Sequence, residues 1–107
     1  MRASSFLLRE CKLELSKALG QALKESRISK GLSQEQVGAS QSYVSDIERG
    51  LKTLSLEKLD EFASGIGVHP ITILARCYLI KEESMKQEDV INRLRLELSL
   101  INQTKSE

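Results

Sequence analysis

The sequence has little of what several protein classes need. It lacks tryptophan, contains one proline, one histidine and two cysteines, and only 4% of its 107 residues are aromatic. Cys11 and Cys77 form no CxxC pair, which indicates reduced, partly buried thiols in a cytoplasmic protein. Charges interrupt every apolar run before the roughly 18 residues of a membrane span, and Phe6–Leu8 is too short for a secretion signal. Membrane, secreted, collagen-like and disulfide-rich classes are excluded, and no membrane partner is expected.

The net charge is also small. It is +1 for the whole chain, so it gives no global argument for a nucleic-acid partner. Residues 1–34 carry seven lysines and arginines against three glutamates, a balance of +4, residues 35–62 have a balance of −3, and the remainder has 0. The basic N-terminal third is equally consistent with a surface that faces phosphate and with an ordinary solvated helix face.

The residues that catalysis or metal binding would need are few and dispersed. His69 precedes Pro70, where the start of a helix is expected, and Cys11, His69 and Cys77 lack zinc-type spacing. The segment Gly65–Gly67 is predicted to terminate a helix, because no phosphate-binding motif continues after it. The sequence therefore predicts no metal, no cofactor and no enzyme.

The N-terminal third has the apolar spacing of a long helix that ends at Gly31. Its predicted inward stripe is Leu8, Cys11, Leu15, Ala18, Leu19, Ala22 and Leu23. Ser33 is the expected N-cap of a short second helix over residues 34–38, with Glu35 in its first turn.

Three more helices are predicted in the middle of the chain. One begins at Ser40 or Gln41 and runs to Arg49, and the next is capped by Ser55 and terminated by the glycines at 65 and 67. Pro70 suits the first position of the last one. The residues predicted to face the core from these last two helices are Leu56, Leu59, Phe62, Ala63, Ile66, Ile73, Leu74, Cys77 and Tyr78. The fold class is all-α.

The C-terminal segment has more apolar residues than a domain of this size needs. Ser84 and Gln87 have the spacing of a capping box, and Asp89 and Arg93 that of an i,i+4 ion pair. A heptad-like seam follows, which predicts a dimerisation helix and consists of Ile91, Leu94, Leu98 and Ile101. Strict alternation of leucines over residues 93–101 also fits a strand, but the absence of β-branched residues over 92–100 favours a helix.

The third predicted helix has a polar face and an apolar back. The back consists of Val44, Ile47 and Leu51, and the polar face consists of Gln41, Ser42, Ser45, Asp46 and Arg49. The major groove of DNA admits such a helix, where glutamine pairs with adenine, serine with several bases, and aspartate accepts from cytosine. A solvated surface helix has the same pattern, so this helix alone does not decide between them.

The flanking segments decide in favour of DNA. The strings LGQALKESRISKGLSQEQV, SQSYVSDIERG and SLEKLDEFASGIGVHP resemble the lambda-repressor-like (XRE/Cro) helix-turn-helix family over about half of the chain. The resemblance implies a five-helix DNA-binding domain over residues 19–81, a helical extension over 1–18 and a dimerisation segment over 82–107.

The resemblance also implies roles for individual residues. Arg27 and Glu48 match a buried structural ion pair. The positions implied to read bases are Gln41, Ser42, Ser45 and Asp46. The positions implied to contact the sugar-phosphate chain are Gln34, Tyr43, Arg49, Lys52 and Thr53.

The sequence departs from the family pattern in three places. The interval from Gln34 to Tyr43 is about one helical turn too short, so the second helix and its turn are expected to be reduced. Leu54 stands where the family commonly has proline. Asp46 adds a negative charge that repels phosphate unless it meets the amino group of a cytosine.

The predicted function is therefore a homodimeric, sequence-specific DNA-binding regulator, most simply a repressor on a palindromic operator. Double-stranded DNA is the expected partner. The alternative is an antitoxin-like or other protein-interaction module, whose apolar C-terminal segment binds a partner protein while DNA binding is secondary or lost.

Overall fold

The computed structural model describes residues 2–105, and the side chains of residues 14–104. This part of the chain contains five α-helices, one 3₁₀ turn and no strand, so the predicted all-α class is confirmed. The helix over residues 93–101 is confirmed against the strand alternative. The elements are α1 (Arg2–Ser29), η1 (Gln34–Val37), α2 (Gln41–Glu48), α3 (Leu56–Ile66), α4 (Pro70–Lys81) and α5 (Gln87–Lys105).

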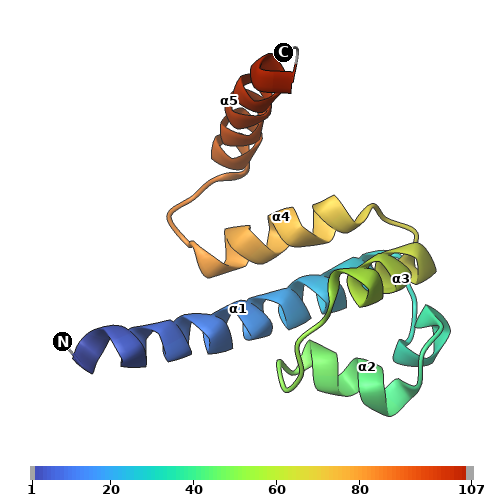
Figure 1. Cartoon of the computed structure of the whole chain (residues 1–107). Helices are drawn as coiled ribbons and strands as arrows, with labels where there is room; N and C mark the ends of the chain where they lie inside the picture. The colour runs from blue at the N-terminus through green and yellow to red at the C-terminus, as the bar shows by residue number, and fades with distance from the viewer. Residues whose placement is uncertain (1, 106–107) are drawn as a thin grey trace.

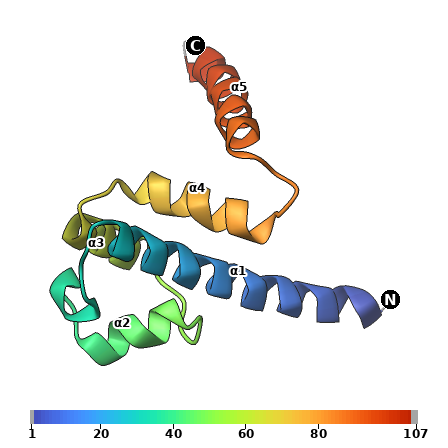
Figure 2. The ribbon, with the colours of Figure 1, turned by 180° about the vertical axis from the view of Figure 1, so that it is seen from behind.

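The core lies between α1 and the helices that pack around its C-terminal half (Figure 1). α4 runs alongside α1, while α2 lies on the other side of α1 in both views (Figure 2). Leu23, Ile73 and Cys77 are fully buried where these helices meet. The predicted inward stripe of α1 holds for Leu15, Ala18, Leu19, Ala22 and Leu23, whereas the side chains of Leu8 and Cys11 lie outside the described residues.

The helix boundaries follow local capping signals. The Ser40 hydroxyl accepts a hydrogen bond from the Tyr43 N–H at 3.3 Å, and Ser55 accepts from the Lys58 N–H at 3.1 Å. His69 Nδ1 accepts from the Ile71 N–H at 3.1 Å, which confirms that the histidine caps α4. α1 ends at Ser29, two residues before the predicted glycine. Because these caps depend on a few neighbouring residues, sequence alone could locate them.

Three apolar residues predicted to face inward are exposed. Leu56 in the first turn of α3 is 76% exposed, because it lies beside an open groove next to Pro70 rather than in the core. Leu51 is 61% exposed because α2 has already ended at Glu48 and its periodicity no longer applies. Tyr78 is 42% exposed, since it faces the space between α4 and α5.

Two glycines allow helices to approach neighbouring backbone directly. A Cβ atom at Gly20 of α1 would lie 2.3 Å from the carbonyl oxygen of Ile47, and one at Gly65 of α3 would lie 2.2 Å from that of Val37. Neither distance is sterically possible. The prediction that Gly65 terminates its helix is therefore wrong: α3 continues to Ile66 and is capped by Gly67. These contacts fix η1 and α2 against the larger helices.

α5 stands apart from this packed domain, on the side away from α2 (Figure 1). Every residue from 91 to 104 is exposed. The predicted capping box of Ser84 and Gln87 does not start α5: the helix begins at Gln87, and Asp89 Oδ2 accepts from the Lys86 N–H at 3.0 Å. Arg93 therefore pairs with Glu97, at 2.8 Å, instead of with the capping aspartate. α5 depends on local interactions within its own sequence.

Some features bear on other functional classes. No single helix within residues 2–105 is both long and apolar enough to cross a membrane; α3 and α4 together, bent by 105°, meet that criterion by length and composition only. Among the described side chains, no group of three histidines, cysteines or carboxylates could hold a metal ion. Cys77 is a buried free thiol, and burial raises its pKa. The Cys11 side chain lies outside the described residues.

Candidate nucleic-acid interface

α2 presents one face to solvent and is held by the other. Val44 and Ile47 on its back are each 1% exposed and belong to the core. On the front, Gln41 and Ser42 are exposed. Ser45 and Asp46 are partly exposed. The four predicted base-reading residues are thus brought together on one accessible face.

Tyr43 lies at the side of α2 against the core. Its ring centroid is 5.9 Å from that of Phe62 in α3, and it is only partly exposed. The ammonium group of Lys52 lies 5.3 Å from the centroid of the Tyr43 ring. Tyr43 therefore connects α2 to α3 and also contacts the segment after α2, in which the exposed Thr53 lies.

An ion pair joins α1 to the C-terminal end of α2. Arg27 Nε donates to Glu48 Oε2 at 2.6 Å, and Arg27 Nη2 donates to Oε1 at 2.9 Å. The two side chains are only 10% and 5% exposed. Arg27 Nη1 also donates to the Leu32 carbonyl at 2.8 Å. The hydrogen bond to Glu48 raises the pKa of Arg27, although burial acts in the opposite direction.

This ion pair extends by hydrogen bonds to the front of α2. Glu48 Oε1 also accepts from Gln34 Nε2 at 3.0 Å, and Gln34 Oε1 accepts from Gln41 Nε2 at 2.7 Å. Gln41 retains its own oxygen and a second amide hydrogen, which are the donor and acceptor that a bidentate contact requires. The structure thus brings four predicted site residues, Arg27, Glu48, Gln34 and Gln41, into one network.

A second cluster surrounds Asp46. Its carboxylate oxygens lie 3.8 Å from Arg49 Nη1 and 3.5 Å from Lys52 Nζ. The sequence indicated only that Asp46 repels phosphate unless it meets a cytosine amino group. The structure adds two cationic partners, because the turn at Gly50 returns Lys52 toward α2. Arg49 and Lys52 remain more than half exposed.

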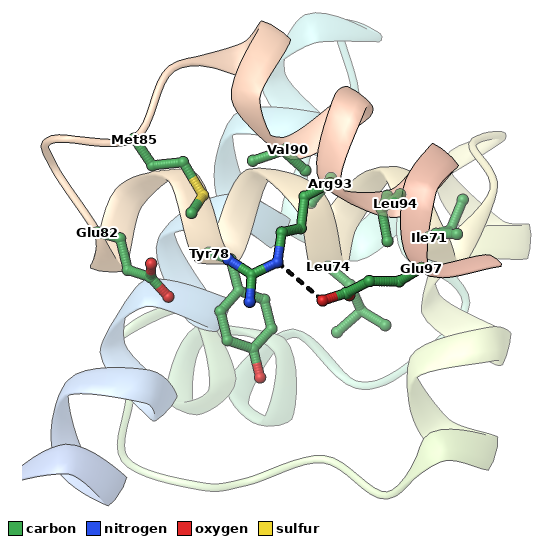
Figure 3. Close-up of a pocket in the computed structure, with 10 residues that line it drawn as sticks. Ile71, Leu74, Tyr78, Glu82, Met85, Val90, Arg93, Leu94 and Glu97 are labelled. Carbon is green, nitrogen blue, oxygen red and sulfur yellow. Dashed lines mark hydrogen bonds and ion pairs between the residues drawn. The ribbon is translucent and has the colours of Figure 1, made fainter. Parts of the chain in front are cut away.

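The residues predicted for dimerisation lie away from α2, on α5. The seam is 37–59% exposed and consists of Ile91, Leu94, Leu98 and Ile101. Between α4 and α5 an open groove of about 500 Å³ is lined by apolar side chains such as Leu74, Tyr78 and Val90, and the Arg93–Glu97 ion pair of α5 lines it as well (Figure 3). The apolar side chains of α4 and α5 that line this groove are therefore not covered by each other.

Sequence reasoning missed two residues that position this interface. Gly20 and Gly65 were not identified as close-approach positions, although each contacts the backbone of η1 or α2. The available signal was a glycine inside an otherwise strong helical pattern, which is unfavourable unless packing requires it. The hydrogen bond from Gln34 to Glu48 was also missed, and no sequence spacing indicates it.

The fold and the exposed polar face of α2 define a helix-turn-helix DNA-binding protein. The helix-turn-helix family model matches residues 23–73. The control protein C.BamHI of Bacillus amyloliquefaciens is 35% identical over 60 residues, which are 51% of this chain and 74% of that protein. The chain belongs to the lambda-repressor-like (XRE) helix-turn-helix family, and it is a DNA-binding transcriptional regulator.

Proposed function

We propose that the protein is a sequence-specific repressor that binds a palindromic operator as a homodimer, with residues 41–49 as its recognition helix. The observation that carries the proposal is the hydrogen-bonded path from the buried Arg27–Glu48 pair through Gln34 to Gln41. This path orients the Gln41 amide before DNA arrives, which reduces the ordering that binding requires. Similarity to a control protein supports a regulatory role.

The proposed contacts fall into two sets. Gln41 reads adenine and Asp46 reads cytosine, while the hydroxyls of Ser42 and Ser45 adapt to neighbouring base edges. The residues proposed to contact the sugar-phosphate chain are Gln34, Tyr43, Arg49, Lys52 and Thr53. Because these two sets differ in whether they depend on base sequence, mutations can separate them.

A dimer through α5 is compatible with the position of α2. The two helices lie on opposite sides of the domain (Figures 1 and 2). A two-fold axis that runs from the α5 side toward the α2 side would join two copies through the seam and leave both α2 helices facing one DNA duplex. Half-sites about one helical turn apart, 34–36 Å, are then expected.

Selection of bound sequences from random duplex DNA at stated salt tests the DNA part of the proposal. Gln41→Ala is expected to lose about 1–3 kcal/mol of binding at one base step, whereas Lys52→Ala weakens all sequences and flattens the salt dependence. Lys86→Ala, which removes an equal charge beside α5, is the control. If both α2-region variants bind every sequence as tightly as wild type, the assigned contacts are wrong.

Analytical ultracentrifugation tests the dimer. Leu94→Ser with Leu98→Ser removes two seam residues and is expected to give a monomer of unchanged helical content. Leu96→Ser with Leu100→Ser is the matched control, since these leucines, at 59% and 53% exposure against 37% for Leu94 and 51% for Leu98, are also exposed but lie off the seam. A wild-type monomer at micromolar concentration, or equal dissociation of both variants, contradicts the seam assignment.

The exposure of α5 also favours a second candidate, the antitoxin-like interaction module. Its apolar side chains lie on two sides of the helix, the seam and the pair Leu96 and Leu100, and none of them is buried by the domain. In this candidate a partner protein covers α5. Co-purification of the product of a neighbouring open reading frame would support it, whereas an inverted repeat upstream of the gene would support the repressor.

A further inference from the structure

The C-terminal end of α2 holds an acidic residue that contacts two cations proposed to bind phosphate. The Asp46 carboxylate lies 3.8 Å from Arg49 Nη1 and 3.5 Å from Lys52 Nζ. The Asp46 side chain is 32% exposed, whereas those of the two cations are 65% and 52% exposed. Together the three groups carry +1, where the two cations alone would carry +2. In the free protein, one carboxylate therefore neutralises half of the positive charge at this end of α2.

These contacts are of a kind that exchanges easily. Exposed ion pairs at such distances contribute little to stability, because water and salt screen them and the side chains lose freedom. In the same position, the Lys52 ammonium group also lies 5.3 Å from the centroid of the Tyr43 ring, a favourable contact that does not need Asp46. The pairs can therefore open when another group takes one of the partners, without disturbing the fold.

We propose that Asp46 is a specificity gate, which restrains Arg49 and Lys52 until the amino group of a cytosine in the major groove takes over its carboxylate. The inference rests on the proposed function. On DNA without that cytosine, the carboxylate repels phosphate and competes with it for both cations. On DNA with it, the N4 amino group donates to Asp46 and both cations become available to the phosphates.

The gate makes one base contact control two phosphate contacts. Phosphate contacts normally strengthen binding to all sequences alike. Each one steepens the slope of log K, the binding constant, against log salt concentration by about 0.9. Here specific DNA would receive more of these contacts than non-specific DNA. Discrimination then exceeds what the Asp46–cytosine hydrogen bond supplies by itself.

The test is Asp46→Asn in the full chain, titrated at several salt concentrations with two duplexes. One duplex is selected by the wild type from a random pool, and the other has the same composition in scrambled order. The variant is expected to bind the scrambled duplex more tightly. Its slope of log K against log salt concentration is expected to be steeper by about 0.9 for each of Arg49 and Lys52 that is freed from Asp46. The ratio of the two affinities is expected to fall roughly tenfold to hundredfold.

Asp60→Asn is the charge-matched control. Asp60 is an exposed residue of α3 beside the groove at Pro70 and Ile71, and its substitution changes the net charge by the same amount. It is expected to leave the affinity ratio unchanged. Adding Arg49→Gln and Lys52→Gln to Asp46→Asn should return the salt dependence on the scrambled duplex to the wild-type value.

The outcomes separate the gate from the function on which it rests. If the wild type binds both duplexes equally, the proposed function fails and the gate fails with it. If the wild type discriminates but Asp46→Asn keeps the wild-type ratio, or matches Asp60→Asn, only the gate is overturned. A gain of affinity that persists without both cations also overturns it. Equal thermal unfolding midpoints of all variants show that the fold is intact.

Discussion

α2 and α5 both present side chains to solvent, but they are stabilised in opposite ways. α2 has eight residues and α5 has nineteen. Helices as short as α2 are unstable alone, so its form depends on its buried back, on the Arg27–Glu48 ion pair and on the close approach of α1. α5 has no buried residue over 91–104 and relies on its own cap and ion pair.

The difference shows where each helix can serve function. α2 is held in place before it meets a ligand, which suits the recognition of base edges at fixed positions. α5 is a helix with uncovered apolar side chains, which suits association with another chain. The comparison predicts that a substitution around α2 changes the free energy of unfolding of the domain strongly. A substitution of similar chemistry in α5 is predicted to change it little.

The largest contrast is expected between Glu48→Ala and Glu97→Ala, because each removes the acidic partner of an arginine. Glu48→Ala leaves the buried Arg27 without its carboxylate and is expected to lower the free energy of unfolding by about 3–5 kcal/mol. Glu97→Ala leaves an arginine that is already exposed and should have no measurable effect. Urea unfolding of both variants measures the difference.

The two variants also differ in what they do to DNA binding. Glu48 accepts a hydrogen bond from Gln34, which in turn holds Gln41, so its loss should weaken sequence-specific binding even where the protein remains folded. Equal unfolding free energies for the two variants would mean that the buried pair does not stabilise α2 and would remove the contrast between the helices.

A smaller effect is expected at Gly20. Alanine is favoured over glycine within a helix by about 1 kcal/mol, so Gly20→Ala would be stabilising if only local structure mattered. The Cβ atom of this alanine, however, would lie 2.3 Å from the backbone carbonyl oxygen of Ile47 and 2.7 Å from that of Glu48. We expect a net loss of about 1–3 kcal/mol in urea unfolding, with weaker DNA binding because α2 must shift.

Lys24→Ala is the control for this substitution. It places alanine at an exposed position of the same helix, where no close neighbour has to move. Its unfolding free energy should remain near that of the wild type. A Gly20→Ala protein as stable as this control would show that α1 does not fix α2 through backbone contact.

The sequence predicted those features that depend on neighbouring residues. The helix that begins at Pro70, the cap at Ser55 and the exposed face of α2 follow from local spacing and side-chain chemistry. The predicted start of α5 was two residues too early. The pairs Ser84–Gln87 and Lys86–Asp89 offer competing caps only two residues apart, and the local sequence pattern does not distinguish them.

Features that depend on tertiary distance could not be predicted in this way. Periodicity gives the inward direction of a helix but not how far the core extends, so Leu56 and Tyr78 were wrongly placed inside. The partners of Asp46 depend on the path of the chain after Gly50. At the candidate site, sequence therefore identified the residue types, their face and the Arg27–Glu48 pair. The hydrogen bonds that link Gln34 to Glu48 and Gln41, and the ion pairs of Asp46, required the structure.

The smallest effect concerns the Glu25–Arg76 ion pair, which joins α1 to α4 as Arg93–Glu97 joins two turns of α5. Arg76 Nε lies 2.6 Å from Glu25 Oε1. This hydrogen bond, followed by one from Gln21, lowers the pKa of Glu25 below its ordinary value of 4.5. The unfolded chain therefore binds a proton at Glu25 more readily than the folded protein does. The stabilisation by this ion pair is present at pH values above the ordinary pKa and is lost as the pH falls through the lowered pKa of the folded protein.

Glu25→Gln should consequently lower stability slightly at neutral pH and make the acid side of the stability curve less steep. Thermal unfolding from pH 7 to pH 3 measures this, with Glu97→Gln as the counterpart in α5. Because Glu97 pairs only within a helix that the domain does not bury, its substitution should leave the acid dependence of domain unfolding as in the wild type. A larger change from Glu97→Gln than from Glu25→Gln would show that α5 unfolds together with the domain, and the distinction between tertiary and local stabilisation would no longer hold.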